Sequence, residues 1–334
     1  DADPRLLAAA NVDKAIEDFR IIEFFFGAAD RDDETAIGAV GCGGRAHGWL
    51  CRKKGGYFTR EFLQNTAVKN GKLPLGRDTD YPQNYAPDVL FPIARDESRR
   101  PLGISEPLPF AGTDIWNAWE LTWLAPGGLP RVATAEIRVP AGSPNLVESK
   151  SLKLYLGSFA MSEFANDAAV CAAIERDLSA VTGGTVEVVL DADVTVVEPG
   201  GTCIDASDTE CTATDVDASL LAADDGETVD ESLHTHLLRS LCPVTNQPDL
   251  GSLIVSYAGP RIDPAALLRY VVSFRQHQDF HEACVERMFI DVLERCRPTR
   301  LSVYARYQRR GGIDINPFRS TQDERPANTR LWRQ

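Results

Sequence analysis

The stretch SLKLYLGSF, at residues 151–159, decides the fold because it recurs as ALLRYVVSF at residues 266–274. Tyr155 of the first copy matches Tyr270 of the second, and both copies end in a Ser-Phe pair. Apolar residues stand three or four positions apart in each copy, which is typical of one face of a helix. We therefore expect a partial internal duplication with a helix in each copy.

The segments around these helices share one order: strand, strand, helix, helix, strand. Aromatic and β-branched residues indicate the strands, and Asp263 before Pro264 is a natural helix start. The expected elements are strands at 116–124, 132–139, 185–190, 253–257 and 301–307, a helix at 170–181, and a long helical stretch at 264–296. This order predicts an α+β fold, in which an antiparallel sheet carries helices on one face.

The repeat divides the chain into four expected parts. Residues 73–190 form the first module and residues 231–334 the second. Between them, residues 191–230 hold 12 Asp or Glu and no Lys or Arg, which predicts a solvated acidic connection. Residues 1–72 match neither module and are expected to be an extension of unknown function, either disordered or translated from a misplaced start.

The bulk composition excludes several classes of protein. No run of about 18 apolar residues is present, so no membrane span is predicted, and the acidic N-terminus does not predict a signal peptide. The eight cysteines form no C-x-x-C pair, which favours reduced thiols in the cytoplasm. The net charge of −14 argues against direct binding of a nucleic acid.

Chemistry is expected where the copies differ, first at the turn SLCPVTNQPDLGS, residues 240–252. Cys242 and Asp249 stand here where the first copy has Leu124 and Arg131. A cysteine in a polar turn is a candidate nucleophile, and Asp249 across the turn could exchange protons with the group under attack. The alternatives are a small buried apolar side chain and a turn-forming aspartate.

Two glutamates and a histidine are further candidates. In the second copy, His281 and Glu282 follow Phe280. The first copy has polar groups of its own at 148–150, a stretch that aligns with 262–264 of the second copy. An ionised carboxylate accepts adjacent N–H donors, so Glu148 and Glu282 suit a guanine-like edge; the alternative is two solvated helix residues.

A metal ion shared by two histidines is the alternative interpretation of this region. His277 and His281 stand four residues apart on the expected helix, a spacing that allows a common metal ion, but no third ligand is evident. We therefore predict no metal site, and expect His281 to orient groups or handle protons.

Four segments resemble signatures of the 7-cyano-7-deazaguanine reductases, and a fifth, together with the long second half, marks the two-module type. They are LVESKSLKLYLGSF (146–159), SLCPVTNQPDLGS (240–252), FHEACVER (280–287), SVYARYQRRGGIDINPF (302–318) and PLPFAGTDIWNAWELTWL (107–124). The likeness runs from residue 73 to residue 334. It implies tandem modules of the tunnelling fold (T-fold), shared with GTP cyclohydrolase I, whose sheets join into barrels and bind purine-like ligands at their seams.

The resemblance also implies a reaction. Cys242 would add to the nitrile carbon of 7-cyano-7-deazaguanine to form a covalent thioimide, and Asp249 would donate a proton to the nitrile nitrogen. NADPH would deliver two hydrides in succession, giving 7-aminomethyl-7-deazaguanine for the synthesis of queuosine in tRNA. His281 would join Cys242 and Asp249 in catalysis.

The implied binding residues form two sets, and the implied assembly is a homodimer. The deazaguanine would be held by Val147, Glu148, Ser149, His281 and Glu282. NADPH would be held by Ser149, Lys150, Arg310 and Gly311. Two alternatives remain open at this point: a zinc-dependent purine cyclohydrolase using His277, His281 and Cys242, and a non-catalytic purine-binding module.

Overall fold

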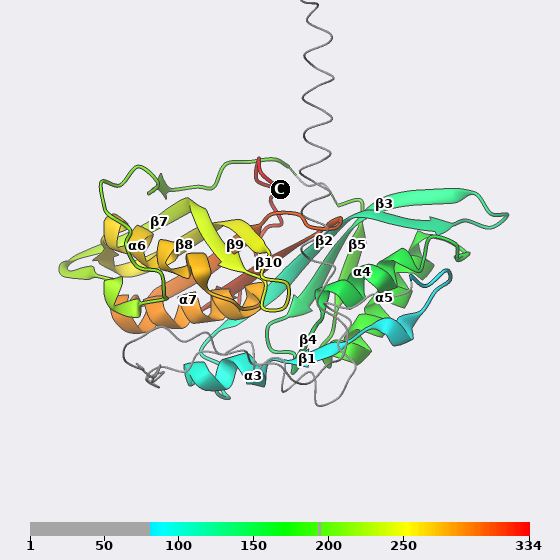
Figure 1. Ribbon diagram of the computed structural model, residues 1–334, viewed down its shortest axis with the longest axis horizontal. Helices are drawn as coiled ribbons and strands as arrows, with labels where there is room; N and C mark the ends of the chain where they lie inside the picture. Colours follow the sequence, from blue (N-terminus) through cyan, green and yellow to red (C-terminus); the bar gives the residue numbers. More distant parts are fainter. Residues whose placement is uncertain (1–80, 193–194) are drawn as a thin grey trace, which may run out of the picture. The chain divides into compact units, whose positions relative to one another are not determined.

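The computed structural model of the protein describes residues 81–192 and 195–334 (Figure 1). The expected extension at 1–72 lies outside the described residues. The strands are β1 Pro92–Ala94, β2 Ala111–Leu124, β3 Pro130–Pro140, β4 Asn145–Val147, β5 Glu187–Leu190, β6 Thr202–Cys203, β7 Ala223–Leu241, β8 Pro248–Ile262, β9 Arg300–Tyr307 and β10 Ile313–Ser320. The α-helices are α3 Asp96–Arg99, α4 Ser149–Gly157, α5 Asp167–Thr182, α6 Pro264–Ser273 and α7 His281–Cys296.

One eight-stranded sheet joins the two modules, in the order β5-β3-β2-β10-β9-β8-β7-β6. Its pairs are antiparallel except for β6 with β7. Strand β10 belongs to the second module but pairs with β2 of the first, with Ile315 opposite Trp116. Helices α4 to α7 lie along the sheet in Figure 1. The predicted α+β fold with an antiparallel sheet is confirmed.

The duplication is visible in matched side-chain contacts. Tyr155 on α4 donates a hydrogen bond to Asp177 on α5 at 2.7 Å, and Tyr270 on α6 donates one to Asp291 on α7 at 2.6 Å. The phenylalanines that end the two repeats, Phe159 and Phe274, are both fully buried. A buried phenol needs a hydrogen-bond partner, so each copy retains the same tyrosine–aspartate pair inside its own helix layer.

The same matching corrects the expected pairing of 148–150 with 262–264. Because Tyr155 matches Tyr270, Glu148 is the counterpart of Asp263, not of Ile262. Both are N-caps: Glu148 accepts the backbone N–H groups of Lys150 and Ser151, and Asp263 accepts those of Ala265 and Ala266. The expected pairing of 148–150 with 262–264 was therefore wrong by one residue, and Glu148 has an acidic counterpart.

The long helix expected at 264–296 is interrupted, so His277 and His281 do not share a helix. Helix α6 ends at Ser273, a 3-10 turn follows at Phe274–Gln276, and α7 begins at His281. The intervening backbone pairs with the end of β7: Leu241 N–H donates to His277 O at 2.8 Å, and Asp279 N–H donates to Leu241 O at 3.2 Å. Hydrogen bonds to a strand replace those that a continuous helix would need.

Two further features were not expected. Strand β10 follows Gly311 and Gly312, in a stretch whose glycines and Pro317 resemble a loop, and it forms by pairing with β2 and β9. Strand β7 begins at Ala223, inside the stretch expected to be an acidic connection. Its acids in this stretch are exposed, and three of them pair with arginines: Asp225 with Arg297, Glu227 with Arg261 and Asp230 with Arg300.

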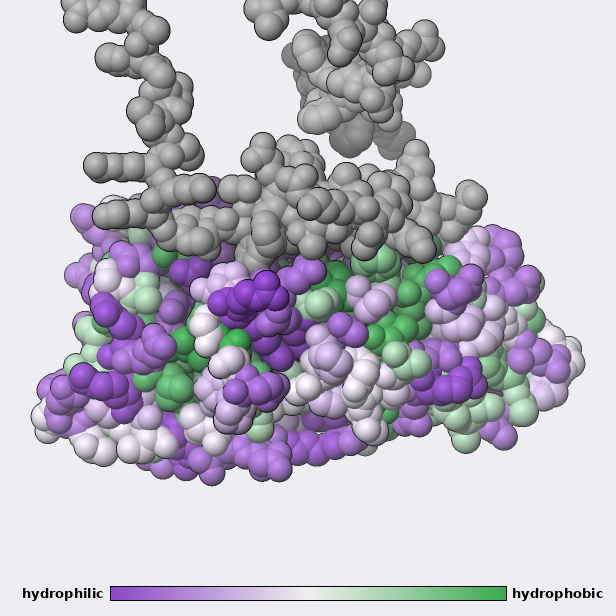
Figure 2. Space-filling view, turned by 90° about the horizontal axis from the view of Figure 1, so that it is seen from below, coloured by the Kyte–Doolittle hydropathy of each residue, from purple (hydrophilic) through white to green (hydrophobic). Residues whose placement is uncertain are grey.

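The surface is mainly polar where it can be seen. Figure 2 shows a face on which hydrophilic residues predominate and hydrophobic residues gather in small groups between them. Of the helices in the described part of the chain, none has the length and apolar character that crossing a bilayer requires.

Candidate active site

A pocket brings together residues from both modules. The first module contributes β2, β4 and the start of α4, and the second contributes the turn after β7, the start of α7 and the β9–β10 connection. The lining residues are Trp116, Leu146, Val147, Ser149, Lys153, Cys242, Pro243, Asp249, Asp279, Phe280, His281, Glu282, Gln308, Arg310, Ile313 and Ile315. Most of the candidate residues, from segments far apart in sequence, therefore line one cavity.

Cys242 is held in the turn between β7 and β8. Its N–H donates to Gln247 O at 2.9 Å, and its carbonyl accepts from Asn246 N–H at 3.0 Å. Asn246 has a φ of 60°, a left-handed conformation that asparagine tolerates better than most residues. Asp249 is the second residue of the return strand β8 and lies opposite Ser240. The turn therefore places a buried thiol and a carboxylate on one side of the pocket.

Asp249 is buried and bound by two nitrogen donors. His281 Nε2 lies 3.2 Å from Asp249 Oδ2, and the Arg310 guanidinium donates to Oδ1. Burial alone would raise the pKa of Asp249, but the hydrogen bonds and charges of His281 and Arg310 outweigh it and lower the pKa below its ordinary value. Asp249 is thus an ionised carboxylate, able to accept a proton before it gives one.

His281 has a fixed orientation at the first residue of α7. Its ring stacks on Tyr307, with centroids 3.8 Å apart and an interplanar angle of 7°. Its Nε2 faces Asp249, and its buried Nδ1 has no hydrogen-bond partner among the described residues. A buried polar atom without a partner is costly, so this nitrogen is a candidate contact for a bound ligand.

Glu282 lies next to an ion cluster that links the modules. Burial, and then the charge of Asp114, raise the pKa of Glu282 to about 7. Asp114 on β2 accepts from Arg319 on β10 at 2.7 Å, and Arg319 also donates to Glu286 on α7 at 2.8 Å. These buried pairs fix the first turns of α7 against the first module, and with them Glu282.

Glu148 is placed differently from the expected substrate contacts. It is fully buried and is absent from the lining of the pocket, whereas its neighbours Val147 and Ser149 line it. Its two carboxylate oxygens accept the N–H groups of Lys150 and Ser151, each at 2.7 Å. The Ser149 hydroxyl also donates to Oε1, at 3.5 Å. A carboxylate has about four lone-pair positions, so Oε2 retains one for a further donor.

Basic residues gather at one side of the pocket, where the expected cofactor residues lie. Arg310 lines it and donates to Gln247 at 2.6 Å. Gly311 has a φ of 59°, and a Cβ there would lie 3.3 Å from the Lys153 side chain. Lys150 does not line the pocket, but Lys153, which the sequence did not single out, does. Burial, and then the charge of Arg310, lower the pKa of Lys153.

Two crowded cations beside a cavity favour an anionic ligand, so these residues fit the phosphates of NADPH. Lys153 could have been found from its spacing: it stands one helical turn after Ser149, on the face that Ser149 turns to the pocket.

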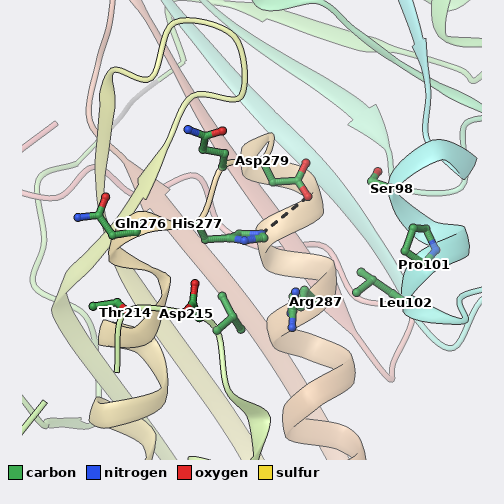
Figure 3. A pocket seen from close by; sticks show the side chains of 11 residues that line it. Ser98, Pro101, Leu102, Thr214, Asp215, Gln276, His277, Asp279 and Arg287 are labelled. Atoms are coloured by element: carbon green, nitrogen blue, oxygen red, sulfur yellow. Dashed lines mark ion pairs between the residues drawn. The ribbon is translucent and has the colours of Figure 1, made fainter. Parts of the chain in front are cut away.

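A second cavity is lined by the segment before α7, residues 276–279, together with residues of other segments (Figure 3). Asp279 lines both cavities, and in Figure 3 it points toward His277, whose Nε2 lies 3.8 Å from Asp279 Oδ2. Burial, and then Arg287, lower the pKa of His277 to about 4, and burial raises the pKa of Asp279 to about 7. His277 therefore belongs to this second cavity, away from the pocket of Cys242.

The arrangement does not form the zinc site of the open alternative. Among residues 81–192 and 195–334, no cluster of His, Cys, Asp or Glu close enough to hold a metal ion includes Cys242, His277 or His281. A buried thiol beside an ionised carboxylate, with a histidine and an arginine on that carboxylate, is instead suited to attack on an electrophilic carbon. Fold and site together define a two-module α+β protein with a thiol site at the seam of its modules.

Comparison with known proteins identifies the family. Residues 81–190 match the family described as "Nitrile reductase, 7-cyano-7-deazaguanine-reductase N-term", and residues 248–326 match that of a "QueF-like protein". The chain belongs to the 7-cyano-7-deazaguanine reductase family.

Several relatives are similar over most of their length. The NADPH-dependent 7-cyano-7-deazaguanine reductase of Azoarcus sp. (strain BH72) is 54% identical over 261 residues, which are 76% of this chain and 92% of that protein. The protein of the same name from Burkholderia cenocepacia (strain HI2424) is 52% identical over 270 residues, 78% of this chain and 98% of that protein. That of Desulfotalea psychrophila is 50% identical over 272 residues, 79% and 98% respectively.

Proposed function

We propose that this chain reduces the nitrile of 7-cyano-7-deazaguanine to 7-aminomethyl-7-deazaguanine with NADPH, in the synthesis of queuosine for tRNA. Membership of the family and the names of the relatives support this activity. The observation that carries it is the convergence of Cys242, Asp249 and His281, with Glu282 and Arg310, on one pocket. The reduction consumes two hydrides and two protons, and the product carries an amine.

The first step is addition of Cys242 to the nitrile. The Sγ atom bonds to the nitrile carbon, one C–N π bond breaks, and the nitrogen takes up a proton to give a thioimide. Asp249 is ionised, so its carboxylate accepts the thiol proton, and its lowered pKa favours the return of that proton to the nitrogen. Asp249 is therefore a shuttle, and no external proton is consumed in this step.

The substrate is held between the modules. Val147, Glu148 and Ser149 approach it from the first module, and His281 and Glu282 from the second. Trp116 and Phe280 line the same pocket and offer aromatic surfaces to a planar ring. The carboxyl groups of Glu148 and Glu282 accept the adjacent N–H donors of the guanine-like edge.

The cofactor is held by Ser149, Lys150, Arg310 and Gly311, to which we add Lys153. NADPH, when bound, supplies the two hydrides. Arg310 would then have two roles, because the guanidinium that would bind a phosphate also donates to Asp249 and keeps it ionised. We further propose a cytoplasmic homodimer without direct nucleic-acid or membrane partners. The six cysteines in the described residues are all free, which supports a reducing compartment.

The mass of the covalent adduct tests this proposal. Protein mixed with 7-cyano-7-deazaguanine without NADPH should gain the mass of one substrate, mapped by peptide analysis to Cys242. Cys242→Ala should show no adduct and no NADPH oxidation, whereas the control Cys171→Ala should behave as the wild type. Wild-type protein with neither adduct nor NADPH oxidation would overturn the assignment. Substrate binding unchanged in Cys242→Ser, without turnover in either protein, would indicate a binding module.

A further inference from the structure

A cysteine and two histidines meet at the β6–β7 edge of the sheet, away from the pocket of Cys242. The Cys203 sulfur and one ring nitrogen each of His234 and His236 all lie within 4.8 Å of one another. None of the three lines either cavity described above. We propose that Cys203, His234 and His236 bind a Zn²⁺ ion that attaches the connection between the modules to the sheet.

The backbone brings these side chains together. Strand β6 runs parallel to β7 and places Cys203 beside His234, and Ile204 N–H donates to His234 O at 2.9 Å. His234 and His236 are two residues apart on β7, so their side chains leave the same face of the sheet. The fully buried Leu233 faces the helix layer instead. Regular pairing thus holds three metal-binding side chains on one side of two neighbouring strands.

Each imidazole ring has a hydrogen-bonding partner at its Nδ1 atom. His234 Nδ1 lies 3.2 Å from Gly200 O, and His236 Nδ1 lies 2.8 Å from Ser252 Oγ. Metal-binding histidines usually give one ring nitrogen to such a carbonyl or hydroxyl partner, which fixes the ring and leaves the other nitrogen for the metal. Here the Nε2 atoms of both histidines are the ones left to bind a cation.

The carboxylate of Glu198 is a candidate for the fourth ligand. Glu198 Oε2 lies 3.8 Å from His236 Nε2, and the exposed Glu198 side chain is free to rotate. One thiolate, two imidazoles and a carboxylate or water form a tetrahedral set that suits Zn²⁺ better than Mg²⁺ or Ca²⁺, which prefer oxygen ligands. Since Cys203 is exposed, the ion can enter from solvent.

The site is structural and independent of the proposed reaction. Its ligands come from residues 198–203 and from β7, so a bound ion would attach the connection to the sheet edge. Metal binding to the native state alone stabilises it by mass action. A chelator should therefore lower the temperature of unfolding without removing the chemistry of Cys242. Chelator sensitivity alone would then no longer identify a zinc-dependent cyclohydrolase.

Metal content of the full-length chain tests the proposal. Wild-type protein is incubated with Zn²⁺ and passed through a desalting column. Elemental mass spectrometry should then find one zinc ion per chain. Its Co²⁺ form should show a thiolate-to-cobalt absorption band. Cys203→Ser should lose both the stoichiometric zinc and the band, whereas Cys211→Ser, in the same connection, should keep both. Ser252→Ala should weaken zinc binding by about 10- to 100-fold, as the loss of a ring-orienting partner does.

The outcomes that overturn the proposal are separate from those that overturn the reductase assignment. Wild-type protein that retains no zinc, or Cys203→Ser that retains zinc and the cobalt band, would refute this site. Zinc lost on Cys242→Ala but kept by Cys203→Ser would place the ion in the other pocket, and would equally refute it. NADPH oxidation with the nitrile substrate is measured on the same preparations and has no bearing on these results.

Discussion

Replacing Glu148 separates its two roles, because the same carboxylate caps a helix and is proposed to recognise the substrate. Both oxygens accept backbone N–H groups at the start of α4, and the side chain is fully buried. Water cannot replace a cap that is removed from such a place. Glu148→Ala therefore leaves the N–H groups of Lys150 and Ser151 without acceptors, whereas Glu148→Gln keeps one acceptor oxygen.

The magnitudes follow from these contacts. Loss of an N-cap costs about 0.5–2 kcal/mol, and a buried donor left without a partner costs about 1–3 kcal/mol. The carboxylate charge is itself costly to bury, since burial raises the pKa of Glu148. Removing this charge therefore offsets part of the loss of stability. We therefore expect Glu148→Ala to lower the free energy of unfolding by about 2–3 kcal/mol and Glu148→Gln by about 1 kcal/mol. Loss of one charge-assisted hydrogen bond to the substrate, about 1.5–3 kcal/mol, should weaken its binding in Glu148→Gln by about 10- to 100-fold.

Urea denaturation and calorimetric titration with 7-cyano-7-deazaguanine measure the two effects separately. The matched control is Asp263→Ala, which removes the equivalent cap from α6, where the acceptor is Asp263 Oδ1 at 2.8 Å from Ala265 N. It should lower stability and leave binding unchanged. A Glu148→Gln protein that binds substrate as tightly as the wild type refutes the recognition role. A Glu148→Ala protein of wild-type stability refutes the capping argument.

Three further changes test the site. Asp249→Asn cannot shuttle the thiol proton, so turnover should fall by about 10²- to 10⁴-fold in NADPH-oxidation assays. Substrate affinity should fall less in this variant than in Glu148→Gln. The opposite ranking of the two affinities would reverse the proposed roles. Lys153→Met removes one half-buried cation, so steady-state kinetics should show a KM for NADPH raised about tenfold with a smaller change in kcat. An unchanged KM would exclude a phosphate contact.

Asp279→Asn tests the second cavity: because the pKa of Asp279 is raised to about 7, its contribution to stability is present in acid and is lost as pH rises through about 7. The variant should therefore gain about 3 kcal/mol relative to the wild type between pH 5 and pH 8 in urea denaturation, and no gain would contradict the raised pKa.

The local elements could be predicted from the sequence because their signals are local. Helix α4 and the strands β2 and β3 lie where periodicity and β-branched residues placed them, and the repeat of Tyr155 in Tyr270 marked the duplication. The interruption after α6 could not be predicted, since its cause is pairing with the end of β7, more than thirty residues upstream. Apolar spacing on either side of the break is equally helical.

The residues of the candidate site could likewise be predicted only in part. Cys242, Asp249 and His281 were found because each differs from the first copy at a matched position. Lys153 was missed although it stands opposite Leu268 in the repeat, because a lysine on an amphipathic helix resembles any solvated residue. Cys203 was assigned to a polar connection, and its partners His234 and His236 lie about thirty residues away. Only the parallel pairing of β6 with β7 makes them neighbours.

Strand β10 explains why a duplicated chain makes one composite site instead of two equal ones. It follows the second copy yet pairs with β2 of the first, so Ile313 and Ile315 enter the pocket beside Trp116. The preceding turn carries Arg310 to Asp249 and sets Gly311 against Lys153. The pocket would lose all of these residues if the two modules were separated. A chain cut between β9 and β10 should therefore keep both helix layers and lose the pocket.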